Sequence, residues 1–145
     1  MLRALLKRLR RDRNGSVAVE FALVGPMLIG MLMGVLQIGI GMQNYNALRG
    51  VSADVARYAV INYQTGNRLS TSQLEDYADG VASGAPYGLD PTRFLATINT
   101  ANVQRVSGAT EYSVTMTYTI PTFLGVFGID EFPVTYTRPV FVISS

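Results

Sequence analysis

The sequence predicts an α+β protein in which one long N-terminal helix packs on a small C-terminal domain with an antiparallel sheet. Residues 21–42 carry no charge and are almost entirely apolar. Apolar residues then recur at three- and four-residue steps as far as Asn62, which is typical of an amphipathic helix. The last third of the chain alternates with a period of two, as strands do. We therefore expect a basic leader at 1–15, a membrane-spanning helix at 16–42, its amphipathic continuation at 43–66 and an α+β domain at 67–145.

Charge is distributed unevenly along the 145 residues, although the formal net charge is only +2. Residues 1–15 hold six basic side chains against Asp12, which gives this segment a charge of +5. Residues 16–145 hold six arginines against nine acids, which gives −3. A basic run directly before an apolar segment is typical of the cytoplasmic side of a membrane anchor. We therefore expect a topogenic leader and no binding of nucleic acid.

The apolar segment at 21–42 is long enough to cross a membrane. At 1.5 Å per residue it spans about 33 Å, against roughly 30 Å for the hydrocarbon core of a bilayer. It is longer than the apolar region of a secretory signal peptide, and no A-x-A cleavage pattern follows it. We expect a retained, single-pass helix in contact with lipid.

Small residues and a proline mark this helix. Gly30 and Gly34 have the GxxxG spacing that lets membrane helices approach each other closely. The alternative is that the glycines reflect only the loose composition of a lipid-facing helix. Pro26 is expected to kink the helix or to release a backbone carbonyl.

The segment from 43 to 66 is expected to continue as a helix of about five turns that packs against the globular domain. Its apolar stripe comprises Tyr45, Leu48, Val51, Val55 and Tyr58. Ser70 and Gln73 then have the spacing of a capping box, which predicts a short helix from this point through Val81.

The next region is ambiguous in the sequence. Asp90 and Pro91 are compatible with the start of a further short helix, and the chain is equally able to enter a strand near Phe94. The sequence is therefore compatible with either a helix or a strand at residues 94–106.

Two strands are expected near the C-terminus. Residues 112–120 alternate strictly, and residues 133–143 are rich in valine, tyrosine, threonine and phenylalanine. The connection between them is apolar, and we expect it to contribute to the core, with an exposed interaction patch as the alternative. Its apolar residues are Phe123, Leu124, Val126, Phe127 and Ile129.

The residue types present argue against an enzyme. The chain has no cysteine and no histidine, and its only lysine is Lys7 in the leader. It therefore lacks a thiolate nucleophile, a histidine base and the usual ligands of a zinc site. The acids at 75, 76 and 79, and those at 130 and 131, are most simply solvated. We expect no catalytic residue, no metal site and no cofactor.

The most informative feature is the border between the leader and the apolar segment. Gly15 closes the leader, Ser16 opens the apolar part, and Glu20 lies four residues later beside Phe21. A charged side chain at the centre of a membrane helix costs roughly 2.5–3.5 kcal/mol, and one near the end costs less. If the chain were cleaved after Gly15, the new α-amino group of Ser16 would be available to neutralise Glu20, in the same molecule or in a neighbour.

This border resembles that of the TadE-like minor pseudopilins of tight-adherence (Flp) pilus systems, which are relatives of type IV pilins. The resemblance covers the leader, Gly15 and Ser16, Glu20 and Phe21, Pro26, and the helix through Tyr58 and Ala59. It implies that a prepilin peptidase cleaves between Gly15 and Ser16 and that Glu20 is required for processing or assembly. TadF-type and TadG-type proteins have a similar N-terminal organisation, so the same residues also resemble those of these two types.

The resemblance also implies partners and a location. The partners would be the prepilin peptidase, other pilins and pseudopilins, the inner-membrane assembly platform and the lipid bilayer. The protein would lie in the bacterial inner membrane with its N-terminus in the cytoplasm and its C-terminal domain in the periplasm, and it would also be able to enter a pilus. The alternative function is a signal-anchored periplasmic binding or scaffold module that is not processed at Gly15.

Overall fold

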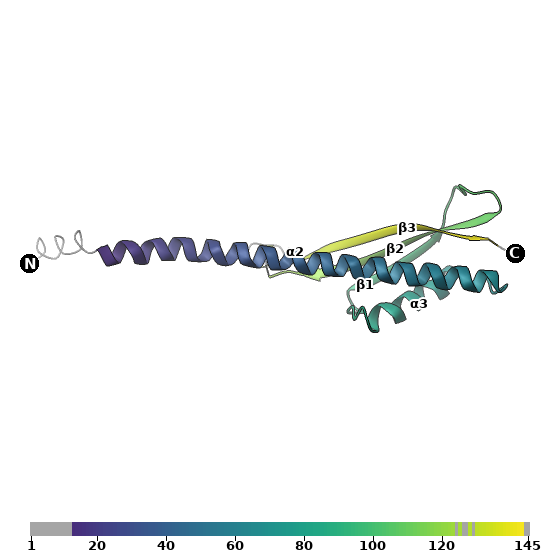
Figure 1. Cartoon of the computed structure of the whole chain (residues 1–145), viewed down its shortest axis with the longest axis horizontal. Coiled ribbons are helices and arrows are strands. Elements are labelled where there is room, and N and C mark those ends of the chain that lie inside the picture. The colour runs from purple at the N-terminus through teal and green to yellow at the C-terminus, as the bar shows by residue number, and fades with distance from the viewer. Residues whose placement is uncertain (1–12, 124, 126–127, 129, 144–145) are drawn as a thin grey trace, which may run out of the picture. The chain divides into compact units, whose positions relative to one another are not determined.

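The computed structural model describes residues 13–123, 125, 128 and 130–143. These residues form two helices and a three-stranded antiparallel sheet, which confirms the predicted α+β class (Figure 1). The leader through Asp12 and four residues of the apolar connection lie outside the described residues, namely Leu124, Val126, Phe127 and Ile129. The elements are α2 (Arg13–Gln64), α3 (Thr71–Ser83), β1 (Phe94–Thr100), β2 (Ala109–Pro121) and β3 (Glu131–Ile143).

Helix α2 is a single helix of 52 residues, as the sequence predicts, and it continues through Pro26 without a break. The chain divides into two compact units, Met1–Ile38 and Gly39–Ser145. In the first unit every large apolar side chain from Val17 to Ile38 is exposed, with fractions between 41% and 77%. A helix that is apolar on all sides is typical of a membrane span.

In the second unit, the part of α2 from residue 39 onward buries one stripe of side chains. Leu48, Val51 and Val55 are completely buried, and Ala56 and Ala59 are nearly so. Their three- and four-residue spacing confirms the predicted amphipathic helix. Each large apolar side chain buried in this way stabilises the fold by about 1.5–3 kcal/mol.

Helix α3 starts where its capping residues place it. The Ser70 hydroxyl accepts a hydrogen bond from the Gln73 N–H, and the Gln73 side chain accepts one from the Ser70 N–H, which confirms the predicted capping box. Leu74, Ala78 and Ala82 are buried at four-residue steps. Tyr77 of α3 stacks on Tyr58 of α2 with ring centroids 3.9 Å apart, so the two helices pack together in this unit.

The segment that the sequence left open is a strand. Residues 94–100 form β1, which pairs antiparallel with β2 from Phe94 opposite Tyr118 to Thr100 opposite Tyr112. No helix starts at Asp90. Its carboxylate instead accepts hydrogen bonds from the N–H and hydroxyl of Thr92, at 2.9 and 2.7 Å, and so closes a turn that leads into the strand.

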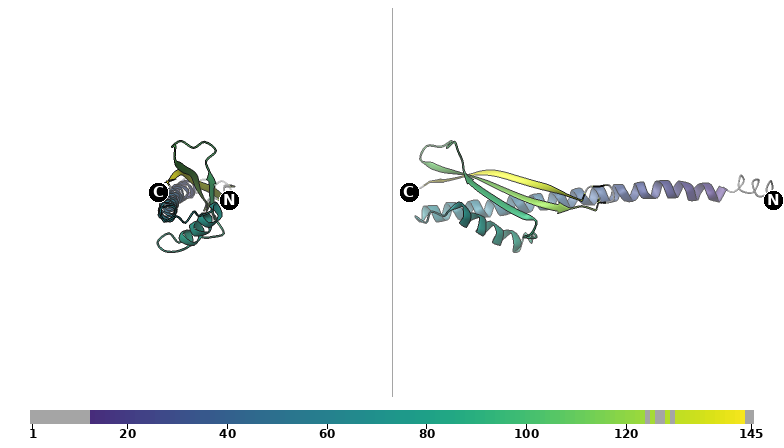
Figure 2. Two further views of the ribbon diagram at one scale, coloured as in Figure 1. Left: turned by 90° about the vertical axis from the view of Figure 1, so that its right-hand side faces the viewer. Right: turned by 180° about the vertical axis from the view of Figure 1, so that it is seen from behind.

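The sheet has the order β1–β2–β3 and carries the core on one face. The buried apolar residues of β2 are those that the alternating pattern predicts, Tyr112, Val114, Met116, Tyr118 and Ile120, and Glu111 is buried as well. Helix α3 and the second-unit part of α2 cover this face, so the unit has two layers (Figure 2). On the other face, Thr115 and Thr117 hydrogen-bond across the strands to Thr137 and Thr135.

The connection between β2 and β3 departs from the prediction at its first apolar residue. Phe123 is 58% exposed, so it does not lie in the core as the sequence led us to expect. The polypeptide is held here by a backbone hydrogen bond from the Thr122 N–H to the Asp130 carbonyl, at 3.0 Å. The exposed alternative therefore holds at this position.

Replacement of Leu48 by alanine is expected to destabilise the second unit. Leu48 is completely buried, and removal of such a side chain typically costs about 2–5 kcal/mol in unfolding free energy. Leu95, which is 61% exposed on β1, provides a control of the same residue type, and Leu95→Ala should change the value by less than about 0.5 kcal/mol. Urea unfolding of the detergent-solubilised chain, followed by tyrosine fluorescence, measures both. Equal losses in the two variants would contradict the packing described here.

Candidate functional site

The border residues all lie in the first turns of α2. Gly15 and Ser16 have helical backbone, and Glu20 follows Ser16 by one turn of the same helix. Residues four apart lie on one face of a helix, so the positions of Ser16 and Glu20 share a face. Glu20 and Phe21 are exposed, and Phe21 is 77% accessible. The structure therefore gathers the border residues into one short helical segment.

The helical backbone at Gly15–Ser16 bears on cleavage. A protease binds its scissile bond in an extended form, and the first turn of α2 would have to open to present it. Gly15 lowers the resistance to this opening, because glycine is a poor helix former.

The apolar part of α2 has the length and composition of a membrane anchor. Among the described residues, one helix, Val17–Gln64, is long and apolar enough to cross a membrane, with a mean hydropathy of 2.0 in its most apolar window. A side-chain carbon built at Gly30 or Gly34 would meet no other atom within 4 Å. These glycines are therefore not required by packing within the described chain, and their role in helix–helix contact stays a prediction.

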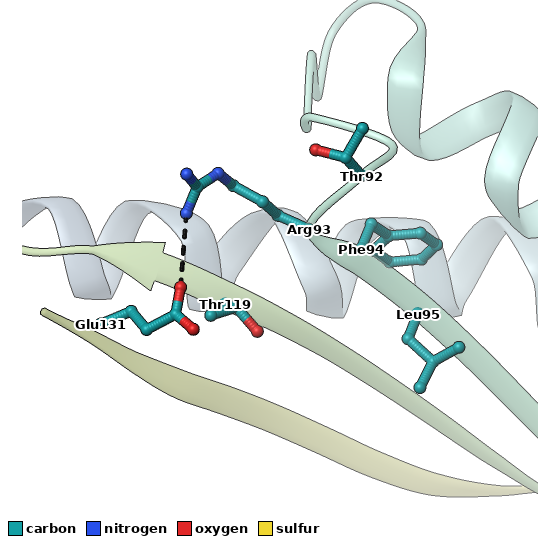
Figure 3. Close-up of a pocket in the computed structure, with 6 residues that line it drawn as sticks. All are labelled: Thr92, Arg93, Phe94, Leu95, Thr119 and Glu131. Atoms are coloured by element: carbon teal, nitrogen blue, oxygen red, sulfur yellow. Dashed lines mark ion pairs between the residues drawn. The ribbon is translucent and has the colours of Figure 1, made fainter.

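An open hollow lies at one end of the sheet, with a volume of about 490 Å³. Figure 3 shows Arg93 reaching across it toward Glu131, with a distance of 3.7 Å between Nη1 and Oε2. Arg93 also lies 3.6 Å from Asp90. Glu131 is thus paired with Arg93, whereas the sequence led us to expect that it would simply be solvated. Exposed ion pairs of this kind stabilise a protein by about 0–1 kcal/mol, so Arg93 and Glu131 form an ordinary surface ion pair at this hollow.

The acids of α3 have two different roles. The Glu75 carboxylate accepts the N–H of Ile98 at 2.7 Å and so ties α3 to β1, a contact that the sequence did not predict. Asp76 and Asp79 are exposed. Burial raises the pKa of Asp79 above its ordinary value, and the neighbouring charges of Asp76 and Glu75 raise it further. No group of three or more acidic, histidine or cysteine side chains in the described residues is arranged to hold a metal ion.

One buried carboxylate outside α3 has a structural explanation. Glu111 is buried, and its oxygens accept hydrogen bonds from Arg105 Nε at 2.8 and 3.1 Å. This hydrogen bonding lowers the pKa of Glu111. The Arg105 guanidinium also lies 5.6 Å from the ring of Phe141. The pair closes the connection between β1 and β2, which accounts for both charges without a catalytic role.

The comparisons with known proteins support the resemblance that the border residues suggested. Residues 15–57 match the family model described as TadE-like protein. No curated protein and no solved structure matches the chain. The match begins at Gly15 and includes Glu20, the apolar part of α2 and its buried stripe as far as Ala56, whereas α3 and the sheet lie outside it. The resemblance inferred from the sequence is confirmed over residues 15–57, where the chain is similar to the TadE-like family.

Proposed function

We propose that this chain is a minor pseudopilin-like membrane protein for assembly of tight-adherence (Flp) pili, matured by a prepilin peptidase between Gly15 and Ser16. The observation that carries the proposal is the TadE-like match, which begins at Gly15 and extends through the apolar helix. The TadE-like family suggests a pilus-associated protein. The position of the glycine at the end of a basic leader adds the processing step to that assignment.

The charge distribution supports one orientation. The leader, with a charge of +5, stays in the cytoplasm, because positive residues flanking an apolar helix are retained on that side. The apolar part of α2 crosses the bacterial inner membrane once. The part of the chain after Met42 then lies in the periplasm, where it is accessible to other pilus components.

Glu20 is the residue that connects processing with assembly. It is the only charged side chain between Val17 and Met42, and in lipid its ionised form is unfavourable unless a positive charge lies close to it. Cleavage after Gly15 creates such a charge, because an α-amino group has a pKa of about 7.7–8.0. We infer that the amine of Ser16 on a neighbouring subunit pairs with Glu20 and sets the register between the helices.

The remaining partners follow from the same role. Helices that carry Gly30 and Gly34 pack closely on the helices of other pilins and pseudopilins, since small residues remove the steric barrier. The prepilin peptidase and the inner-membrane assembly platform act on this chain as a substrate and a building unit. It supplies no catalytic group of its own and requires no cofactor.

A second function is favoured by one observation. The backbone at Gly15–Ser16 is helical, which suits an uncleaved signal anchor better than a protease site. In this alternative the chain is a periplasmic binding or scaffold module that keeps its leader. The two functions differ in the mass of the mature protein and in their tolerance of changes at Glu20.

The length of the mature chain tests processing directly. In cells that make the peptidase, the intact mass should correspond to a chain that starts at Ser16. Gly15→Val should leave the leader in place, because the site requires a small residue. Gly39→Val provides a matched control, since a side-chain carbon built at Gly39 meets nothing within 4 Å, and this variant should be processed normally. An unmodified chain that keeps its leader in the presence of the peptidase would exclude the proposal and support the anchor.

Glu20→Gln is expected to reduce incorporation into pilus assemblies. The amide keeps the size of the side chain but removes the charge that pairs with the amine, and loss of such a pair lowers association by about tenfold or more. Quantitative immunoblotting of the isolated assembly complex measures this, normalised to the processed chain in the membrane. Glu20→Asp retains the charge and should retain most of the incorporation. Equal incorporation of the amide variant and the unmodified chain would refute the role of Glu20.

A further inference from the structure

A groove runs between α2 and the free edge strand β3, entirely within the unit Gly39–Ser145. It has a volume of about 580 Å³, and Ile61 and Phe141 expose 50% and 37% of their surfaces at it. Its lining residues from the helix are Ala53, Ala56, Arg57, Val60 and Ile61, and those from the strand are Arg138, Pro139, Val140 and Phe141. The groove is therefore mainly apolar, with two arginines and no acid in its lining.

These arginines have no acidic partner within the described part of the chain. Arg93 and Arg105 form the ion pairs found there, and neither Arg57 nor Arg138 takes part in one. Arg49 lies about two turns before Arg57 on α2, with its guanidinium 6.0 Å from the ring of Tyr136 on β3. The helix and strand thus present a positive ridge beside an apolar groove, which fits an acidic partner surface.

The same chain carries a complementary surface on α3. Asp76 and Asp79 are exposed, and neither forms an ion pair in the residues that the structure describes. Burial raises the pKa of Asp79, and the charges of Asp76 and Glu75 raise it further, so a cation brought close to this exposed face would be favourable. The two aspartates lie on the exposed face of α3 between Ser72 and Ser83.

A glycine on this face supports close approach by another molecule. Gly80 lies inside α3, where glycine costs about 1 kcal/mol relative to alanine. A side-chain carbon built at Gly80 meets nothing within 4 Å, so packing within the described chain does not require glycine here. Ser83, three residues later on the same helix, is also small. The surface beside the aspartates is therefore low enough for the backbone or an arginine of a neighbouring molecule to lie against it.

The two surfaces lie on different sides of the unit. The groove is at β3, one edge of the sheet, whereas α3 packs against β1, the other edge. A contact between two different surfaces of identical chains is heterologous, and such contacts generate open helical arrays unless the rotation happens to close a ring. This is the symmetry of a filament or of a stack of subunits at its base.

We propose that the groove between α2 and β3 binds the acidic face of α3 from a second copy of this chain, with Arg57 and Arg138 facing Asp76 and Asp79. The inference rests on the proposed assembly function for its setting, because copies that share a membrane have a high effective concentration. A contact of this size and polarity is weak between freely diffusing molecules and becomes effective between anchored neighbours.

Disulfide trapping tests the contact, because the natural chain contains no cysteine. Two differently tagged full-length chains, one with Ala53→Cys in the groove and one with Ser83→Cys on α3, are co-expressed in membranes and oxidised. Both positions are exposed, and both replacements are small. Thr97→Cys, on the exposed face of β1, replaces Ser83→Cys in the control for random collision. We expect the groove–α3 disulfide to exceed the control by about tenfold, the ratio that 1.4 kcal/mol of preference gives.

Charge reversal separates this contact from simple crowding. Arg57→Glu in the groove chain should reduce the disulfide to the control level, as should Asp79→Arg in the α3 chain. The two reversals combined across the pair should restore it, which a misfolded variant would not do. A yield at the control level with unaltered charges, a yield unaffected by reversal, or a groove–groove disulfide that dominates would each overturn the proposal.

The same samples distinguish this inference from the proposed function. The intact mass of each chain reports whether the leader was removed after Gly15. A processed chain without the specific disulfide overturns the copy-to-copy contact and leaves the pilus role in place. A chain that keeps its leader but forms the charge-dependent disulfide excludes maturation and leaves the contact established.

Discussion

The protein depends on one helix that has to satisfy two different surroundings. Between Val17 and Ile38 every large apolar side chain of α2 is exposed, which is unfavourable in water over such a length and favourable in lipid. From Leu48 onward only one stripe is apolar, and that stripe is completely buried against the sheet and α3. A single element thus combines an apolar, membrane-length segment with part of the core of the second unit.

This constraint explains where the chemistry of the chain is concentrated. Glu20 is conspicuous because it is the only charged side chain between Val17 and Met42, and Arg57 because it lies in the groove between α2 and β3. We propose that each of them faces another molecule of complementary charge, Glu20 within the membrane segment and Arg57 on the domain.

The sequence predicted those features that arise from local patterns. The length of α2, the capping box at Ser70 and the alternation in β2 each follow from residue spacing within one element. Contacts between elements could not be predicted from such local patterns. The bond from Ile98 to Glu75 and the groove beside Arg138 require the register of the sheet, and β1 became a strand because β2 pairs with it. The exposure of Phe123 likewise depends on a turn that composition alone does not define.

The most direct test measures whether each part of α2 is in contact with water or with lipid. Single cysteines at Ile29 and Leu36, and at Ser72 of the domain as a reference, are treated with a membrane-impermeant maleimide in spheroplasts. We predict that Ser72→Cys reacts at once, whereas Ile29→Cys and Leu36→Cys react only after the membrane is dissolved and the chain is unfolded. Rapid labelling of all three in intact spheroplasts would contradict the membrane anchor and, with it, the assembly role proposed for this protein.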